Sequence, residues 1–399
     1  MSYINFKEEN TVTYEQLEKR KKNNEKIYIN ILKHKCECLI DYNPSKKYSY
    51  NTFIGDEIGK NGKLNEEDFY EINNEDIICT KFKNCSFKNL KFKNCRFIGC
   101  TFEDCTFELG GVIFENCTLI KEDTNKYPSL NKKDNLSCSF YNCKMYIKFL
   151  NSDISYCIFE NCKINDTVFE NTFMKNIIIN KSEMNSITIK DCDMSGFKMI
   201  NYYITNLEFD DNYKTKFDEK TYFDKIHIRN KTKEEYEGVY MTYEVLANKF
   251  KENTLNNNFG EYYYLGKCIE RKSLKKFLPR VTSTIAWLTC GYGERAEFSL
   301  FSGLVMIFIF AIIYLFTGVK IDDVKDIHYT LSNIGSLKPH EVIGDFNETL
   351  NLSIGMFGGV GSINGCPSEL SYIISNFEMI IGVIMIGVGI GALTRKIVR

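Results

Sequence analysis

The sequence predicts a multi-domain membrane protein with a repetitive β-solenoid, an α-helical hairpin and a C-terminal pair of membrane spans. Three observations predict this fold class. Apolar residues recur every five positions between residues 79 and 210, two C-terminal segments are apolar over about 20 residues, and a glycine-rich stretch separates them. We expect four regions: 1–75 of unassigned role, 76–210 the solenoid, 211–296 a helical linker, and 297–399 the membrane portion.

Composition excludes several classes of protein. The 51 basic and 52 acidic residues give a net charge of −1, which offers no global attraction for nucleic acid, and we expect no nucleic-acid partner. The sixteen cysteines show no paired zinc spacing, so a buried column of reduced thiols is favoured over disulfides or a metal site. We expect no cofactor and no metal. The N-terminus has no apolar core and is not expected to be a signal peptide.

The first 75 residues are the least informative. Thr13–Leu32 contains helix formers and a Lys/Arg run. We interpret it as a helix with a solvated face, in preference to a nucleic-acid patch.

The five-residue period fits neither a helix nor an alternating strand. Phenylalanine occupies it without a gap from Phe82 to Phe107, and a second uninterrupted run extends from Phe159 to Phe209. A smaller residue, often cysteine, stands two positions before many of these, and Ile120–Leu136 interrupts as a polar loop. A solenoid whose coil has several short, similar faces explains such a period.

This pattern resembles the pentapeptide-repeat family over roughly residues 79–210. The resemblance implies a right-handed quadrilateral β-helix with four repeats per coil. The central residue and the residue two before it would then stack inside. Some members of that family are acidic DNA mimics, but the outward positions here are basic and neutral, for instance Lys81, Lys88 and Lys93. A scaffold surface is the modest alternative.

The period stops after Phe209. Lys233–Lys251 has the apolar spacing of an amphipathic helix, and Gly260–Lys276 follows as a second helix, so we expect an antiparallel hairpin. Leu278–Leu288 carries the only tryptophan, Trp287, and is expected to lie at the membrane surface.

Two segments are candidates to span a bilayer: residues 298–318, without charge, and 370–393, with Glu378 alone. Two buried core helices are the weaker alternative. Basic residues precede the first segment and follow the second, which places both termini in the cytoplasm and 319–369 outside. We therefore expect a multi-pass protein of the cell membrane, with the lipid bilayer as a partner. The outer loop is acidic, which favours either cation attraction or plain solubility; its acidic residues are Asp322, Asp323, Asp326, Glu341, Asp345, Glu348 and Glu369.

A short helix over 347–355 and the glycines after it complete this region. Two spans, a short helix and a glycine-rich turn resemble the two-helix pore module of the potassium-channel superfamily. Residues 290–295 (CGYGER) and 377–382 (FEMIIG) resemble bacterial proteins that join pentapeptide repeats to an ion-channel domain. The resemblance implies a homotetramer that passes monovalent cations, with a re-entrant pore loop at 345–364.

The filter departs from the potassium-channel pattern. Its expected residues are Gly358, Gly359, Val360, Gly361, Ser362 and Ile363. Aligned with the family sequence TVGYG, the threonine is replaced by Gly359, the aromatic residue by Ser362, and the second glycine by Ile363. A β-branched residue resists the positive φ that glycine permits. We expect altered or weak selectivity, and a non-conducting relative stays open.

Glu378 is expected to brace the filter from behind, for instance by accepting hydrogen bonds from the backbone of the short helix. The alternative is a protonated, hydrogen-bonded packing residue. The second span also contains Gly382, Gly387, Gly389 and Gly391, which favour close helix packing over a gating hinge.

Two functions remain. The first is a tetrameric cation channel whose β-helix is a sensor or scaffold. The second is a non-conducting, membrane-anchored scaffold that recruits a protein partner. No catalytic residue is expected, because the four histidines are scattered and no nucleophile elbow or phosphate loop is present.

Overall fold

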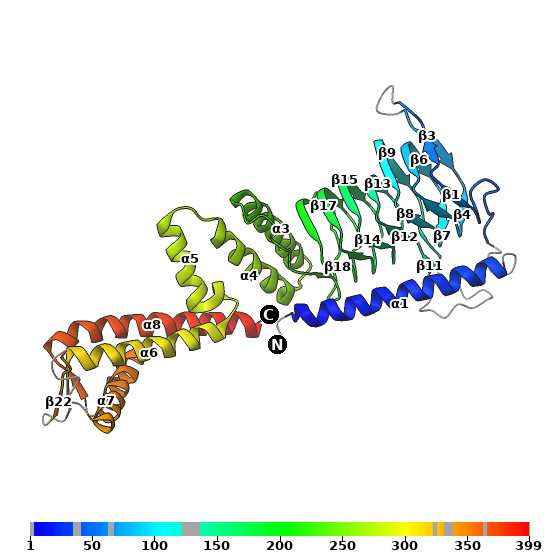
Figure 1. Cartoon of the computed structure of the whole chain (residues 1–399). Helices are drawn as coiled ribbons and strands as arrows, with labels where there is room; N and C mark the ends of the chain where they lie inside the picture. The colour runs from blue at the N-terminus through cyan, green and yellow to red at the C-terminus, as the bar shows by residue number, and fades with distance from the viewer. Residues whose placement is uncertain are drawn as a thin grey trace. The chain divides into compact units, whose positions relative to one another are not determined.

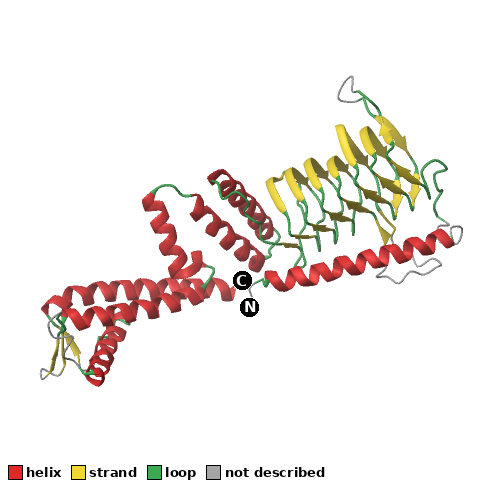
Figure 2. Ribbon diagram, in the orientation of Figure 1, coloured by secondary structure: helices red, strands yellow, loops and turns green. Residues whose placement is uncertain are grey.

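The computed structural model describes residues 4–34, 41–62, 68–121, 136–321, 325–330, 338–361 and 365–398. The chain divides into two compact units, residues 2–273 and 274–399. Figures 1 and 2 show both units.

The first unit is a β-solenoid of short strands (Figure 2). The strands are β1 (Thr52–Ile54), β2 (Glu57–Gly59), β3 (Tyr70–Asn73), β4 (Asp76–Ile78), β5 (Lys81–Lys83), β6 (Ser86–Lys93), β7 (Arg96–Ile98), β8 (Thr101–Glu103), β9 (Thr106–Glu115), β10 (Ile120–Lys121), β11 (Leu136–Ser137), β12 (Ser139–Tyr141), β13 (Lys144–Leu150), β14 (Ile158–Glu160), β15 (Lys163–Glu170), β16 (Ile178–Asn180), β17 (Glu183–Lys190), β18 (Lys198–Ile200), β19 (Tyr203–Phe209) and β20 (Tyr222–Phe223).

Two long parallel sheets form the main faces. One has the order β1-β5-β8-β12-β14-β16-β18-β20 and the other β19-β17-β15-β13-β9-β6-β2. The register advances by 20 residues per coil, because Phe159 pairs with Ile179 and Ile179 with Met199. Twenty residues are four pentapeptides, so the five-residue period does specify a solenoid. The strands extend beyond the expected limits of 76–210 on both sides, from β1 to β20.

The core consists of stacked rings and buried thiols. Phe82, Phe102, Phe140 and Phe159 stack face to face with centroids 4.7 to 4.9 Å apart. The expected cysteine column is present as free, buried thiols. Cys100 Sγ, for example, donates to the carbonyl oxygen of Ile77 one coil away at 3.1 Å. Each thiol thus fills core volume and also satisfies a backbone acceptor.

Asparagine turns many corners of the solenoid. Asn94 and Asn116 have φ values of 53° and 52°, the left-handed region that asparagine tolerates better than most residues. Their side chains also join the coils, since Asn116 Nδ2 donates to Asn94 Oδ1 at 3.2 Å. A second ladder continues from Asn161 to Asn142 at 2.7 Å. The corners therefore carry hydrogen bonds between coils.

The helix α1 (Phe6–Lys33) packs along the solenoid (Figure 1). Leu17 is fully buried and contacts Ile158 and Ile178, which point outward from β14 and β16. Arg20 donates to the carbonyl oxygens of Tyr156 (3.1 Å) and Asn176 (2.7 Å). Burial lowers the pKa of Arg20 to about 10. The expectation of a merely solvated helix is therefore incomplete, since one side of α1 is docked.

Other contacts fix α1 at both ends. Asn10 Oδ1 accepts from Tyr222 Oη at 2.9 Å, and Tyr28 Oη donates to the carbonyl oxygen of Cys79 at 3.3 Å. Between them, Asn24 Nδ2 lies 3.2 Å from Ser137 Oγ. The helix thus follows the solenoid from its last strand toward its first coils.

Two helices close the last coil: α3 (Lys233–Glu252) and α4 (Asn256–Ser273). Tyr262 Oη accepts from the amide of Phe223 and donates to its carbonyl oxygen, at 2.9 and 2.7 Å. Tyr243 Oη accepts from the amide of Ile226 at 2.8 Å. These tyrosines satisfy the edge that would otherwise present unpaired backbone groups. The expected helical hairpin therefore belongs with the solenoid and is not a separate linker over 211–296.

The second unit contains four helices and a small sheet within its described residues. Its elements are α5 (Phe277–Cys290), η1 (Gly291–Gly293), α6 (Ala296–Thr317), β21 (Val319–Ile321), β22 (Lys325–Ile327), α7 (Pro339–Phe357), β23 (Gly365–Pro367) and α8 (Glu369–Val398). Among the described residues, α6 and α8 are the two helices that are long and apolar enough to cross a membrane, by length and composition alone. The short helix expected at 347–355 is the longer α7, and the sheet β22-β21-β23 was not expected.

Helix α7 packs against α6 and α8 around a small apolar cluster. Its Leu352 is fully buried with Phe310 and Tyr314 of α6, and Ile374 and Ile381 of α8 contact the same cluster. Many apolar side chains of α6 and α8 remain exposed, among them Leu300, Phe301, Phe377 and Ile384. Exposed apolar surface on this scale indicates a lipid or protein environment.

Candidate functional site

The described part of the predicted filter, Gly358–Gly361, and Glu378 lie near the place where α6, α7 and α8 meet. Helix α7 ends at Phe357, so Gly358 begins the loop that leads toward β23. Glu378 of α8 is fully buried beside α7. The three helices thus bring together residues 314, 353 and 378, which lie far apart in the sequence.

Glu378 joins all three helices through hydrogen bonds. Tyr314 Oη of α6 donates to Glu378 Oε2 at 2.6 Å. Ser353 Oγ of α7 donates to Glu378 Oε1 and also lies 2.9 Å from the carbonyl oxygen of Ile307. The donors are side-chain hydroxyls, whereas we expected backbone groups of the short helix. A carboxylate in an apolar segment needs such partners, and two hydroxyls supply them.

Sequence reasoning missed Tyr314 and Ser353. The sequence signal was weak, because α6 and α7 contain other hydroxyl side chains, such as Ser302 and Thr349. A tyrosine or serine in such a place usually finds a buried partner. Glu378 was the one carboxyl group within the predicted spans, but which hydroxyl groups it would meet depends on how the three helices pack.

The loop after α7 begins as a tight helix cap. The amides of Val360 and Gly361 both donate to the carbonyl oxygen of Gly355, at 3.0 and 3.1 Å. Gly359 and Gly361 have φ values of 73° and 76°, which glycine adopts without strain. The Val360 side chain is 86% exposed. Ser362 and Ile363 lie outside the described residues.

The glycines of α8 differ in their surroundings. A Cβ on Gly382 would overlap the carbonyl oxygen of Phe357, so α8 touches the end of α7 there. A Cβ on Gly389 would lie 3.3 Å from Ser299 Cβ of α6. No atom lies within 4 Å of a Cβ on Gly387 or Gly391. Close packing therefore applies to Gly382 and Gly389 within the chain, and α8 continues as one helix through all four.

The first half of α7 is attached to the small sheet. Asp345 is buried, accepts from Tyr329 Oη at 2.9 Å, and forms an ion pair with Lys325. Burial and this hydrogen bond raise the pKa of Tyr329 to about 12. Asp345 is thus a structural partner and not part of an open acidic surface. Asp322 and Asp323 of the expected acidic loop lie outside the described residues.

The solenoid surface carries charges of both signs. Lysines pair with glutamates on the neighbouring coil, as in Lys83–Glu103 (2.8 Å) and Lys91–Glu115 (2.5 Å). Such a surface differs from a uniformly acidic one. The sheet that contains β13 and β15 exposes a group of side chains on these two strands: Lys144, Tyr146, Lys148, Lys163, Asn165 and Asp166.

Among the residues that the structure describes, no group of three or more histidine, cysteine, aspartate or glutamate side chains is placed to hold a metal ion.

Comparison with known proteins concerns the solenoid. Residues 82–122 match a family model described as pentapeptide repeats (9 copies). No curated protein matches the chain. Among solved structures the chain is similar to QnrB1, a plasmid-mediated fluoroquinolone resistance protein. A trypsin-treated form is 11% identical over 50% of this chain and 96% of that one, with a TM-score of 0.28. The full-length form is 13% identical over 43% and 93%, with a TM-score of 0.11.

Proposed function

We propose that this chain, whose first unit contains a pentapeptide-repeat β-solenoid, is a membrane-anchored scaffold. The solenoid recruits a protein partner, and α6 and α8 hold it at the cell membrane with both termini in the cytoplasm. The observation that carries the proposal is the stacked solenoid, supported by the family match at 82–122. Coils joined by ladder hydrogen bonds form a rigid surface, and solenoids of this kind commonly bind partners along a face. No catalytic step is part of the proposal.

The face we assign to the partner is the exposed group on β13 and β15. Tyr146 is 37% exposed there, between Lys144 and Lys148. Tyrosine is enriched in protein interfaces because it combines a large apolar ring with a hydroxyl group. The flanking lysines favour a partner with acidic groups.

A photo-cross-linking amino acid at position 146 tests this proposal in cells. The matched control is position 213, where Tyr213 is 90% exposed on a loop between β19 and β20. We expect a discrete cross-linked product from position 146 that position 213 does not give, and Lys148→Glu should reduce it. Equal labelling at the two positions would contradict recruitment by this face.

A second candidate is a cation channel made from four copies of the chain. The observation that favours it is α7, a helix packed between α6 and α8 and followed by Gly358, Gly359 and Gly361. In this candidate α7 and its loop enter the membrane from outside, which is tolerated only where protein or a pore surrounds the backbone. The loop lacks the threonine and the second glycine of a potassium filter, so we propose altered or weak selectivity among monovalent cations.

Two measurements separate the candidates. The channel requires a tetramer in detergent and conductance in planar bilayers that Gly361→Ala changes. A recording of high potassium over sodium selectivity would contradict the proposed weak selectivity. A verified tetramer that gives no current would contradict conduction itself. Silence together with the cross-link at position 146 leaves the scaffold.

A further inference from the structure

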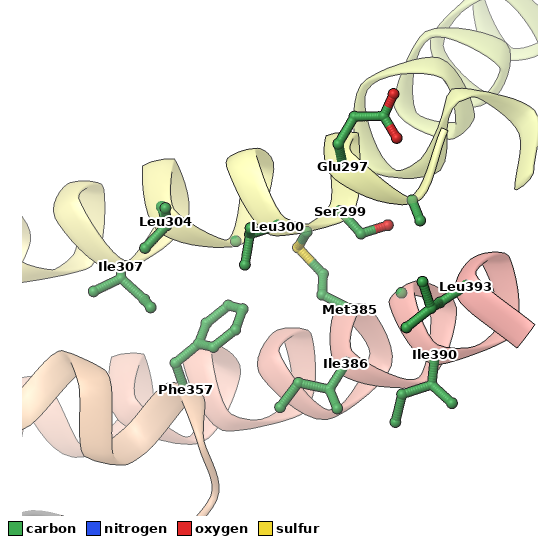
Figure 3. A pocket seen from close by; sticks show the side chains of 13 residues that line it. Glu297, Ser299, Leu300, Leu304, Ile307, Phe357, Met385, Ile386, Ile390 and Leu393 are labelled. Carbon is green, nitrogen blue, oxygen red and sulfur yellow. The ribbon is translucent and has the colours of Figure 1, made fainter. Parts of the chain in front are cut away.

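A groove between α6 and α8 is not used by either proposed function. Its volume is about 490 Å³, and Figure 3 shows its side chains. Leu300, Leu304 and Ile307 come from α6, Met385 and Ile390 from α8, and Phe357 from the end of α7. All six side chains are apolar.

The polar groups lie at one end of the groove. Glu297 and Ser299 are near the start of α6, and Figure 3 shows the Glu297 carboxylate turned away from the apolar side chains. Ser299 Oγ already donates to the carbonyl oxygen of Thr289 at 2.6 Å. The groove therefore has one polar end and an apolar length, which is the polarity of an amphiphile.

The length of the groove matches half a bilayer. From Ala296 to Ile307 the lining advances eleven residues along α6, or about 16 Å at a rise of about 1.5 Å per residue. The hydrocarbon core of a bilayer is about 30 Å thick, so one leaflet is about 15 Å. Phe357 closes the deep end, and the start of α6 marks the surface end.

Several charges lie at that surface end. Arg395 Nη1 lies 3.7 Å from Glu294 Oε1, and Lys396 Nζ lies 4.0 Å from Glu297 Oε2. Both ion pairs are long, and the Arg395 side chain is 53% exposed. A phosphodiester accepts hydrogen bonds from guanidinium and ammonium groups such as those of Arg395 and Lys396. Apolar volume in a bilayer is filled by lipid acyl chains and not by water, because water there would find no polar partner.

We infer that this groove binds one acyl chain of a phospholipid from the cytoplasmic leaflet, with the headgroup beside the start of α6. The inference rests on the proposed membrane anchoring. A bound chain contacts Phe357, the residue next to Gly358, so the lipid supports the end of α7. A second copy of the chain is the competing occupant.

Leu300 and Phe301 provide a matched pair for the test. They are adjacent on α6, and each is 71% exposed, but only Leu300 lines the groove. In a Trp287→Phe background, Leu300→Trp and Phe301→Trp each leave one tryptophan at nearly the same depth. Trp287→Phe keeps an aromatic ring against Phe298, where the two rings now lie edge to face.

The two variants are reconstituted in vesicles of dibrominated phosphatidylcholine and phosphatidylglycerol and then transferred to an excess of bromine-free detergent. We expect both tryptophans to be quenched in vesicles, and only Leu300→Trp to keep most of its quenching in detergent. Equal recovery of both overturns the groove, since the lipid would be merely annular. Quenching of Phe301→Trp alone in vesicles also overturns it, since a second copy would cover the groove.

Failure of the anchoring has a different signature. If neither tryptophan is quenched in vesicles, the membrane proposal itself fails. Native mass spectrometry of the unmodified chain gives an independent readout if a variant misfolds. We expect a phospholipid adduct that survives detergent exchange, and its absence overturns the inference.

Discussion

Gly382 of α8 lies directly against the carbonyl oxygen of Phe357, the last residue of α7, and a Cβ at position 382 would overlap that oxygen. The contact involves backbone on the α7 side, so no side-chain rotation relieves an added methyl group. The missing side chain of Gly382 therefore fixes how closely α8 approaches the loop that starts at Gly358.

We expect Gly382→Ala to destabilise the second unit by about 1–3 kcal/mol, because the backbone must shift to accept the methyl group. The measurement is thermal unfolding of the detergent-solubilised chain. Gly387→Ala is the matched control, since a Cβ there meets no atom within 4 Å. Alanine should be neutral or stabilising at 387, because it favours helix over glycine. Similar melting temperatures for the two variants would sink the assignment of Gly382 to close packing.

Removal of the Glu378 carboxyl group should lower the free energy of unfolding of the second unit, because the hydrogen bonds that join α6, α7 and α8 are lost. Glu378→Ala leaves the hydroxyl groups of Tyr314 and Ser353 without this acceptor, at a cost of about 1–3 kcal/mol. Glu378→Gln should cost less, because its amide oxygen still accepts one hydrogen bond. The same unfolding assay measures both variants, with exposed Glu369→Ala as the control on the same helix. Equal effects of Glu378→Ala and Glu369→Ala would show that the hydrogen bonds carry no weight.

The solenoid unit should lose stability in acid through Glu235. Burial by itself raises the pKa of this carboxyl group. The backbone amides of Arg229, Asn230 and Lys231 donate hydrogen bonds to it at 2.7 to 2.8 Å, and together these lower the pKa by more than burial raises it. The net pKa of Glu235 is therefore below the usual value. A lowered folded-state pKa means that Glu235 stabilises the fold above its unfolded pKa of about 4.3. That contribution is lost as the pH falls through the folded-state pKa.

Glu235→Gln should therefore lower the melting temperature at pH 7, and the gap to the unmodified chain should close below about pH 4. Glu234→Gln is the control, because Glu234 is exposed on the same turn. A gap that stays constant with pH would mean that the charge of Glu235 does not contribute.

The proposed orientation of the chain in the membrane can be tested through the thiol of Cys366. This residue is exposed on β23, whereas the solenoid cysteines such as Cys100 and Cys162 are about 1% exposed. If residues 319–369 are outside the cell, a membrane-impermeant maleimide should label the chain on intact cells, and Cys366→Ser should abolish that labelling. Labelling that appears only after permeabilisation would reverse the proposed orientation. Solenoid thiols should react only after denaturation, since reaction needs an accessible thiolate.

The solenoid could be predicted from the sequence because its apolar residues recur with a fixed period. The five-residue repeat specifies which residues point inward, and Phe82 and Phe102 stack as that spacing implies. The docking of α1 was not predicted, although Ile98, Ile158 and Ile178 are outward positions with aliphatic residues. An aliphatic residue at an outward position indicates a covered face, but nothing in the repeat says which segment covers it.

The candidate site also contains one residue that the sequence identifies and partners that it does not. Glu378 was identifiable as an isolated carboxylate in an apolar segment, while its partners Tyr314 and Ser353 depend on how three helices meet. The sheet of β21, β22 and β23 was missed because each strand has only three residues. Patterns of that length contain too few positions for a period to be recognised. Conduction by the loop stays a prediction, and residues 362 and 363 lie outside the described part of the structure.

The docking of α1 sets a rule for the length of the solenoid. Neighbouring coils are about 4.8 Å apart, which corresponds to about three residues of helix at about 1.5 Å each. The contacts follow this pace: Asn10 meets Tyr222, Leu17 meets Ile158 and Ile178, and Asn24 meets Ser137. The solenoid and α1 therefore advance at matching rates. A chain that gains one 20-residue coil must gain about three residues in α1 to keep the contacts between α1 and the coils in register.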